Sequence, residues 1–291
     1  MRTNKMLAAK GFKMTLILAG HSSGGFEEGI YFAADSHITQ NNHVLVKGFK
    51  KVIEIPIRVK GLNFCGEWFN GYLGNRYEGA CSVAFAGSSL VAQHLINSMR
   101  NHLTGLFPTY YNGSYQIVMS CEANKHLRQT NYDESMFLDS HLDTILTAEY
   151  VSQVICHSIE AVLNKAREHG SMSRLFTAYQ AEFILGVQCP QTREYFLYQY
   201  EIVPDQELGA RVETTKVDQN ELAVIGAKKF KGGALIELAQ CKGEEKTSER
   251  IFRYLNSVIE SETSIGNNGI GKPSGLYNLQ GNILSRIGFE R

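Results

Sequence analysis

Several apolar runs in this chain do not alternate with polar residues, and this pattern constrains the fold more than any other feature. Residues 14–20 and 30–34 are almost continuously apolar, and a glycine-rich segment separates them. A strand with one face in solvent alternates apolar and polar residues, whereas a strand that is covered on both faces does not. The two runs therefore predict a hairpin in a sheet that lies between other layers.

Other apolar and periodic segments complete a predicted order of strands, two helices, strands, two helices and a last strand. Apolar residues recur at helical spacing in the predicted helices, and Ser88 or Ser89 can cap the first of them. The predicted helices cover residues 88–103, 148–169, 233–239 and 247–259. The predicted strands cover residues 14–20, 30–34, 44–46, 52–57, 83–86, 182–187, 195–202, 221–225 and 276–284.

This order predicts the α+β class, with two antiparallel sheets between two helix layers in a four-layer αββα sandwich. Residues 15–291 are expected to form a single domain. Residues 60–80, which are rich in glycine, asparagine and aromatic side chains, are expected to be an inserted loop within it. Residues 1–14 lack a structural pattern, and we interpret them either as a leader (propeptide) or as the result of a mis-assigned translation start.

Composition and local spacing exclude several classes of function. The chain has 29 basic and 29 acidic side chains, so it lacks the basic field that a nucleic-acid binder needs. No apolar run approaches the roughly 18 residues that span a membrane. The six cysteines are scattered, which is typical of reduced thiols in a cytoplasmic protein. Because neither the cysteines nor the nine histidines have local ligand spacing, we predict no metal and no cofactor.

Three segments carry the strongest functional signal: Thr15 at the start of the first strand, Asp35 at the end of the second, and Lys51 sixteen positions later. Their local texts are "TLILAG", "GIYFAADSHIT" and "VLVKGFKKVIEI", followed by "VAFAGSSLVAQHLI". With these motifs the chain resembles the proteasome β-type family of N-terminal nucleophile (Ntn) hydrolases, which includes 20S proteasome β subunits, HslV and the bacterial protein Anbu. The texts "VIGAKKFKGG" and "SETSIG" look more like Anbu than a 20S subunit.

The resemblance implies a catalytic role for each of five residues. Thr15, once it is the first residue, is the nucleophile, and its own α-amine, with an unperturbed pKa near 8, accepts the hydroxyl proton. The Lys51 ammonium lowers the pKa of that amine, and Asp35 holds Lys51 charged and oriented. Gly87 offers its backbone N–H to the oxyanion. Ser264 matches the family's serine that hydrogen-bonds the terminal amine.

The resemblance also places four residues in substrate binding: His37, Ile38, Phe85 and Ser89. Phe85 and Ser89 flank Gly87 at positions that line the family's primary specificity pocket. A phenylalanine at the base of this pocket favours substrates with small side chains.

The function implied by the resemblance is that of a threonine endopeptidase, a protease that cuts peptides and proteins inside a self-associated ring or spiral. An unfoldase ATPase is compatible with such an assembly as a partner. Met14 precedes Thr15, so either the Met14–Thr15 bond is cut or translation starts at Met14. Two alternatives stay open: a catalytically inactive structural subunit, because residues 226–229 replace the family's Gly-Ser-Gly segment, and an Ntn amidohydrolase that acts on small amides.

Overall fold

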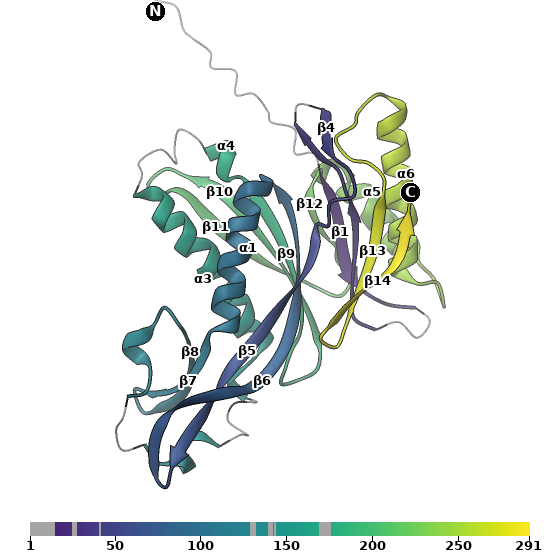
Figure 1. Cartoon of the computed structure of the whole chain (residues 1–291). Coiled ribbons are helices and arrows are strands. Elements are labelled where there is room, and N and C mark those ends of the chain that lie inside the picture. Colours follow the sequence, from purple (N-terminus) through teal and green to yellow (C-terminus); the bar gives the residue numbers. More distant parts are fainter. Residues whose placement is uncertain are drawn as a thin grey trace, which may run out of the picture.

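The computed structural model describes residues 15–24, 28–40, 42–128, 132–138, 142, 144–168 and 176–291, so the predicted leader, residues 1–14, lies outside the described part. The chain contains both helices and strands. Helices α1 (Ser89–Thr104) and α3 (Ala148–Arg167) lie on one side of the strands, and α5 (Lys231–Gln240) and α6 (Thr247–Ser264) lie on the other (Figure 1). The α+β class predicted from the sequence is therefore confirmed.

One sheet has five strands in the order β12-β1-β2-β13-β14, and all neighbouring pairs are antiparallel. Its strands are β1 (Leu16–His21), β2 (Ile30–Asp35), β12 (Ala223–Gly226), β13 (Ser274–Gln280) and β14 (Ile283–Glu290). The two apolar runs at the start of the chain form the buried strands β1 and β2, as predicted. The single strand predicted over 276–284 is wrong, because a turn with Gly281 at φ +60° divides this region into two strands.

The other large sheet has seven strands in the order β11-β10-β9-β6-β5-β7-β8. Its strands are β5 (Val52–Cys65), β6 (Trp68–Gly87), β7 (Leu106–Tyr111), β8 (Ser114–Met119), β9 (Ala181–Gln188), β10 (Tyr195–Asp205) and β11 (Gly209–Val217). A separate small hairpin consists of β3 (Ile38–Gln40) and β4 (His43–Val46). The sequence did not predict β3, β7, β8 or β11.

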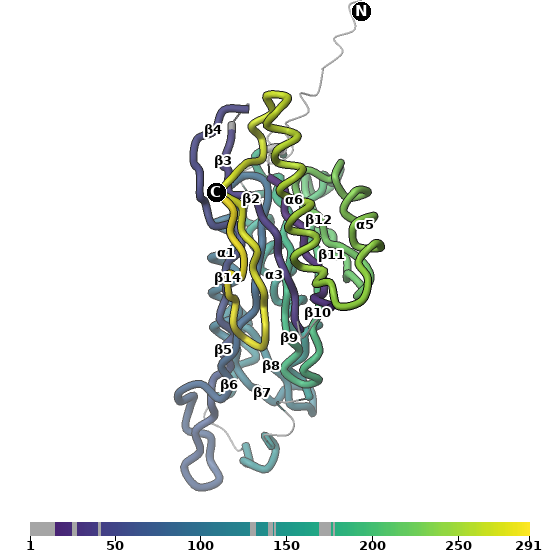
Figure 2. The backbone as a smooth tube through the Cα atoms, turned by 90° about the vertical axis from the view of Figure 1, so that its right-hand side faces the viewer, coloured from purple at the N-terminus to yellow at the C-terminus, as the bar shows by residue number. Residues whose placement is uncertain are grey.

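The expectation of an inserted loop over residues 60–80 is wrong. These residues belong to β5 and β6, which pair from Val52–Ala84 out to Cys65–Trp68 with several register shifts. The outer part packs on its own small apolar cluster, which includes Phe69, Leu127 and Phe137. Glycines made this segment resemble a loop, but in the structure they allow the irregular register of a long hairpin that projects at one end of the molecule (Figures 1 and 2).

The predicted helices all occur, with ends that differ by a few residues. The helices are α1 (Ser89–Thr104), α3 (Ala148–Arg167), α4 (Phe176–Tyr179), α5 (Lys231–Gln240) and α6 (Thr247–Ser264), with short 3₁₀ turns η1 (Ala123–Lys125), η2 (Glu134–Phe137) and η3 (Lys228–Phe230). Thr147 caps α3, because its hydroxyl accepts the Tyr150 backbone N–H at 3.1 Å. Ser88 precedes α1, but its side chain makes no capping hydrogen bond.

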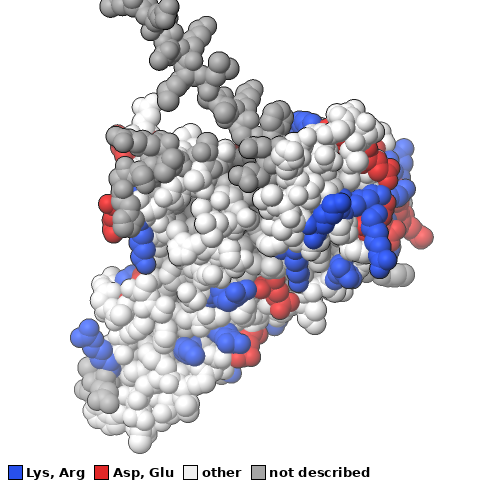
Figure 3. Space-filling model, turned by 45° about the horizontal axis from the view of Figure 1, so that its top comes forward, with Lys and Arg blue, Asp and Glu red and all other residues white. Residues whose placement is uncertain are grey.

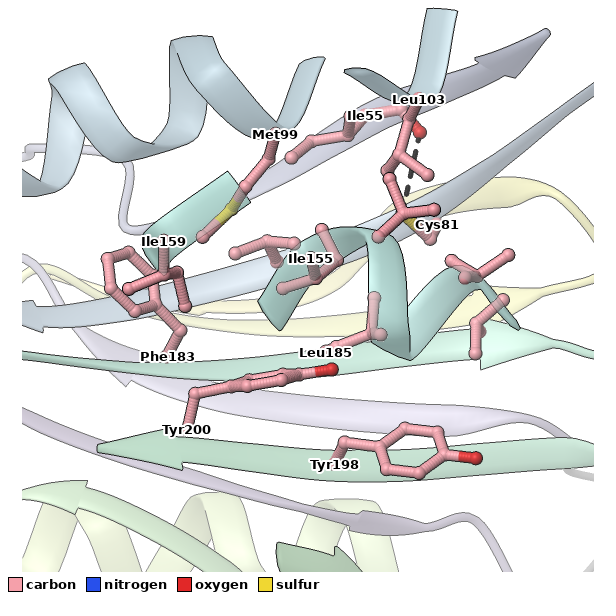
Figure 4. Close-up of a cluster of buried hydrophobic side chains, with 14 of the residues drawn as sticks. Ile55, Cys81, Met99, Leu103, Ile155, Ile159, Phe183, Leu185, Tyr198 and Tyr200 are labelled. Atoms are coloured by element: carbon pink, nitrogen blue, oxygen red, sulfur yellow. Dashed lines mark hydrogen bonds between the residues drawn. The ribbon is translucent and has the colours of Figure 1, made fainter. Parts of the chain in front are cut away.

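Three apolar clusters hold these elements together in layers. The first lies between α1, α3 and the seven-stranded sheet, where Met99 and Ile159 cover Phe183 (Figure 4). The second lies between the two sheets and includes Ile17 of β1. The third packs Leu16 of β1 against α5 and α6. Since successive residues of β1 enter different clusters, the strand is apolar on both faces, which explains its continuous apolar sequence.

The outer surface carries charges of both signs in small groups, with uncharged areas between them on the face that Figure 3 shows. Among the described residues, none of the helices combines the length and the hydropathy that crossing a bilayer requires. Figure 2 shows α5 and α6 in front of the five-stranded sheet when the molecule is viewed from their side.

Candidate active site

Thr15, Asp35 and Lys51 lie together in the folded chain. Thr15 directly precedes β1, Asp35 is the last residue of β2, and Lys51 directly precedes β5. Antiparallel pairing of β1 with β2 sets Asp35 beside the start of β1, where one carboxylate oxygen accepts the Leu16 N–H at 2.9 Å. The side chains come from both large sheets, so the site lies where the two sheets meet.

The Lys51 ammonium connects the other two side chains. Its Nζ lies 2.9 Å from Thr15 Oγ1, and 2.9 and 3.0 Å from the two Asp35 carboxylate oxygens. The Asp35 carboxylate also accepts the His37 backbone N–H at 3.1 Å. Asp35 is therefore held by backbone donors from two directions, and it fixes the ammonium against the threonine hydroxyl.

All three residues are shielded from solvent, with exposed fractions of 7% for Thr15, 1% for Asp35 and 3% for Lys51. Burial lowers the pKa of Lys51 from its ordinary value, because an ammonium loses its hydration in this environment, while the Asp35 carboxylate opposes that shift. A lysine with a lowered pKa can exchange a proton with the adjacent hydroxyl more readily than an exposed lysine can.

The segment after β12 holds the backbone of Thr15. The Ala227 N–H donates to the Thr15 carbonyl oxygen at 2.8 Å. Gly226 has φ +84°, and a Cβ atom at this position would lie 1.9 Å from the same oxygen. Only glycine can adopt this conformation so close to Thr15, so the turn after β12 requires glycine at position 226.

Glu182 of β9 supports this turn, and the sequence analysis did not identify it. Its carboxylate accepts the Gly226 N–H at 2.7 Å and forms an ion pair with Lys228 at 2.9 Å, although the glutamate side chain is fully buried. Glu182 also pairs with Ala86 across β6 and β9, so it touches the strand that leads to Gly87. The available sequence signal was an acidic residue at the start of an otherwise apolar strand.

Gly87 ends β6 with φ +108°, and a Cβ atom there would lie 2.3 Å from the Gln180 carbonyl oxygen. Val52, the residue after Lys51, pairs with Ala84, and the Lys51 carbonyl accepts the Phe85 N–H at 3.2 Å. The pairing therefore puts the end of β6 beside Lys51, at the same end of the sheet.

The four predicted substrate-binding residues have different surroundings. Phe85 is buried and meets the Phe49 ring edge-to-face, with 6.0 Å between ring centroids, and Ser89 is half-buried at the start of α1. The buried His37 ring has its Nε2 2.8 Å from the Lys272 carbonyl oxygen, and Ile38 is half-buried at the start of β3. The His37 ring thus contacts the loop before β13, and its role in substrate binding stays a prediction.

The hydrogen bond described for Ser264 does not join it to the three-residue cluster. Its hydroxyl donates to the Ser261 carbonyl oxygen at 2.7 Å within α6, and the residue is exposed. The end of α6 reaches the β12 turn through another pair, in which Lys229 Nζ lies 2.8 Å from a Glu262 carboxylate oxygen.

A pocket of about 210 Å³ borders the pair of Asp35 and Lys51 on the side of β13 and β14. Phe49, Tyr277 and Arg286 contribute to its walls. Its lining joins strands β2, β13 and β14 of the five-stranded sheet to residues 48–51, which precede β5, so the charged pair borders a cavity.

Comparison with known proteins identifies the fold. No family model matches the chain, and no curated protein matches it. Two solved structures of Anbu from Hyphomicrobium sp. strain MC1, one of them a Gly-1 mutant, each have a TM-score of 0.50. The structure without the mutation shares 16% identity with this chain, and the match covers 94% of this chain and 87% of that chain. The Gly-1 mutant shares 14% identity, and the match covers 95% of this chain and 86% of that chain.

A structure of Anbu (ancestral beta-subunit) from Yersinia bercovieri has a TM-score of 0.47 at 16% identity, with 94% of this chain and 87% of that chain covered. Identities this low describe a shared fold rather than a shared activity. From the Hyphomicrobium structures we conclude that the chain has the proteasome-like fold of the Anbu proteins.

Proposed function

We propose that this protein is a threonine peptidase of the Ntn-hydrolase class, with Thr15 as its nucleophile. The observation that carries the proposal is the 2.9 Å contact between Lys51 Nζ and Thr15 Oγ1, made by a buried lysine that Asp35 holds in place. The layered packing of two sheets between helices is consistent with the αββα sandwich of that class.

The proposed reaction has two steps. Thr15 Oγ1 attacks the carbonyl carbon of the scissile peptide bond, and its proton passes to the Thr15 α-amine with Lys51 as the adjacent proton carrier. The Gly87 N–H stabilises the negative oxygen that develops. The leaving nitrogen takes the proton as the C–N bond breaks, which leaves an ester on Thr15. Water then hydrolyses the ester and restores the hydroxyl.

This mechanism requires Thr15 to be the first residue of the mature chain. We propose that either cleavage of the Met14–Thr15 bond or translation from Met14 followed by methionine removal exposes it. In both cases the amine that accepts the proton belongs to the residue that attacks. We further propose that the peptidase works in the cytoplasm as a self-associated ring or spiral, which electron microscopy of purified particles can test.

An inactive structural subunit is the second candidate, and one observation favours it. The Ser264 hydroxyl donates a hydrogen bond to a carbonyl oxygen of its own helix, whereas the corresponding serine of the family hydrogen-bonds the terminal amine. An Ntn amidohydrolase that acts on small amides uses the same Thr15 chemistry and differs in the substrate that it accepts.

The test combines the mature N-terminus with covalent labelling. Intact mass and N-terminal sequencing are measured on the purified full-length product, which is then treated with a peptide epoxyketone that needs both the hydroxyl and the free amine. We expect an N-terminus at Thr15 and one label per chain. Thr15→Ala and Lys51→Met should abolish the label, whereas Thr215→Ala, on the exposed side of β11, should retain it.

Each other outcome has a definite meaning. An N-terminus upstream of Thr15 without labelling refutes the peptidase and leaves the structural subunit. Labelling of the Thr15→Ala variant at the wild-type rate places the nucleophile elsewhere. Labelling at Thr15 with hydrolysis of small amides, but not of peptides, supports the amidohydrolase.

A further inference from the structure

We propose that His102, Cys121 and His157 form a binding site for a divalent transition metal, with Zn²⁺ as the matching ion. Their ligand atoms all lie within 4.8 Å of one another, although the residues come from three separate elements. Two imidazoles and one thiolate are a ligand set that suits zinc. This site is distinct from the Thr15 cluster and does not depend on the proposed peptidase activity.

The surrounding structure fixes the three backbone positions. His102 lies in the last turn of α1, His157 lies in α3, and Cys121 lies in the turn after β8. α1 and α3 pack on each other above the seven-stranded sheet through buried apolar residues. The turn at Cys121 is held by Glu122, whose carboxylate accepts the Met119 N–H at 3.0 Å. The ligands therefore approach one another because of packing that is independent of any metal.

The spacing of two of the ligand atoms matches tetrahedral coordination. Zinc bonds of about 2.3 Å to sulfur and about 2.0–2.1 Å to nitrogen, at a tetrahedral angle, place the two ligand atoms about 3.5 Å apart. Cys121 Sγ and His157 Nε2 are separated by 3.5 Å. A metal can bind between these two atoms with little movement of either side chain.

A hydrogen-bond chain selects the metal-binding form of His102. The Ser158 hydroxyl has a single proton, which it donates to the Val154 carbonyl oxygen at 2.6 Å. The 2.8 Å contact between Ser158 Oγ and His102 Nδ1 must then use the proton of Nδ1. Nε2 of the neutral ring keeps a free lone pair, which is the form that a metal requires. Ser158 is fully buried, so this support is rigid.

The site lies at the surface and leaves one coordination position for water. His102 and His157 are half-buried, whereas Cys121 is exposed, so an ion can enter from solvent. Three protein ligands and a water complete four-coordination. His102 is about 20 Å along α1 from Ser89, where the helix begins near Gly87. We therefore expect the metal to tie the end of α1 and the turn after β8 to the middle of α3, rather than to take part in chemistry at Thr15.

The test measures metal binding to the full-length protein after it has been treated with a chelator and desalted. Zn²⁺ is titrated in competition with a chromophoric chelator, and Co²⁺ is used as a spectroscopic probe of thiolate ligation. We expect one Zn²⁺ per chain, a higher melting temperature with Zn²⁺, and a thiolate-to-cobalt absorption band. Cys121→Ser and His157→Gln should each weaken binding at least tenfold and remove the band or the thermal shift.

Matched variants separate the site from adventitious binding by surface thiols and imidazoles. Cys65→Ser and His43→Gln remove exposed residues outside the cluster and should bind Zn²⁺ like wild type. Ser158→Ala keeps all three ligands but removes the partner of His102 Nδ1, and it should weaken binding about tenfold. Melting curves of the metal-free variants check that each is folded.

Two results overturn the proposal. One is wild-type Zn²⁺ affinity in a folded variant that carries both Cys121→Ser and His157→Gln. The other is wild-type protein that binds no Zn²⁺ under these conditions, which would leave the contact between Cys121 and His157 as a thiol–imidazole hydrogen bond only.

Discussion

Asp35→Asn tests the electrostatics of the candidate active site, because it removes one charge and keeps the side-chain shape. In the wild-type protein the Lys51 ammonium has the two Asp35 oxygens at 2.9 and 3.0 Å, and the two side chains are 3% and 0% exposed. In the variant the ammonium is buried without its counter-ion. Removing one partner of a buried ion pair typically costs about 3–5 kcal/mol.

The charge-dependent part of this cost cannot exceed the free energy of deprotonating Lys51, since the folded variant can release that proton. At about pH 7.5, neutralising a lysine of ordinary pKa near 10.5 costs about 4 kcal/mol, and this cost falls by about 1.4 kcal/mol for each pH unit. The asparagine NH₂ also replaces an oxygen that accepts a backbone N–H from Leu16 or His37, which adds about 1–3 kcal/mol at any pH.

The sign of the pH dependence follows from the pKa of Lys51. Burial lowers this pKa and Asp35 opposes the shift, so the variant lowers it further. Consider a pH between the pKa of Lys51 in the folded variant and the higher pKa of Lys51 in the folded wild-type protein. There the unfolded chain binds more protons than the folded variant, so the stability of the variant rises with pH relative to wild type. The difference in free energy of unfolding should shrink by up to about 1.4 kcal/mol per pH unit until wild-type Lys51 also loses its proton.

The assay is urea denaturation at about pH 7.5, 8.5 and 9.5, at one protein concentration. The double variant Asp35→Asn/Lys51→Met is the control, because it has no titrating lysine and its deficit should change little over this range. A gap between wild type and Asp35→Asn that stays constant with pH would refute the reasoning.

Substitutions at three further residues test the surroundings of the site. Gly226→Ala places a Cβ against the Thr15 carbonyl. It should destabilise the fold by about 1–3 kcal/mol or more and slow epoxyketone labelling. Labelling at the wild-type rate would contradict the role of this turn. Phe85→Ala leaves a cavity beside Phe49 that should cost about 3–5 kcal/mol and shift cleavage in a peptide-library digest towards larger side chains, and an unchanged preference would exclude Phe85 from the pocket. Glu182→Ala should lower the free energy of unfolding by about 1–3 kcal/mol, because the Gly226 N–H loses its acceptor. Glu182→Gln keeps an acceptor and should cost less in the same denaturation assay. Equal costs for the two variants would argue against this hydrogen bond.

The parts of the fold that were predictable from the sequence are those with local signals. Continuous apolar runs identified β1 and β2, and helical periodicity identified α1, α3 and α6. The motifs around Thr15, Asp35 and Lys51 also allowed the three residues to be grouped before their distances were known. Antiparallel pairing of β1 with β2 then accounts for the position of Asp35, because the end of one strand meets the start of the other.

Features that depend on distant partners were not predictable in this way. The outer hairpin over residues 60–80 is stabilised by Leu127 and Phe137, which lie far along the chain, so its local composition of glycine, asparagine and aromatic residues suggested a loop. Glu182 acquires its role from the β12 turn. No local spacing marks His102, Cys121 and His157, which helix packing brings together. In each case the determining contact joins elements that the sequence separates widely.

The backbone clamp on Thr15 has a consequence for the timing of activity. The threonine carbonyl is held by Ala227, and the turn that provides this donor depends on Glu182. Both residues are synthesised long after the nucleophile leaves the ribosome. Under the proposed mechanism a nascent or C-terminally truncated chain would carry the attacking hydroxyl without its support, so hydrolysis would begin only after the C-terminal half has folded.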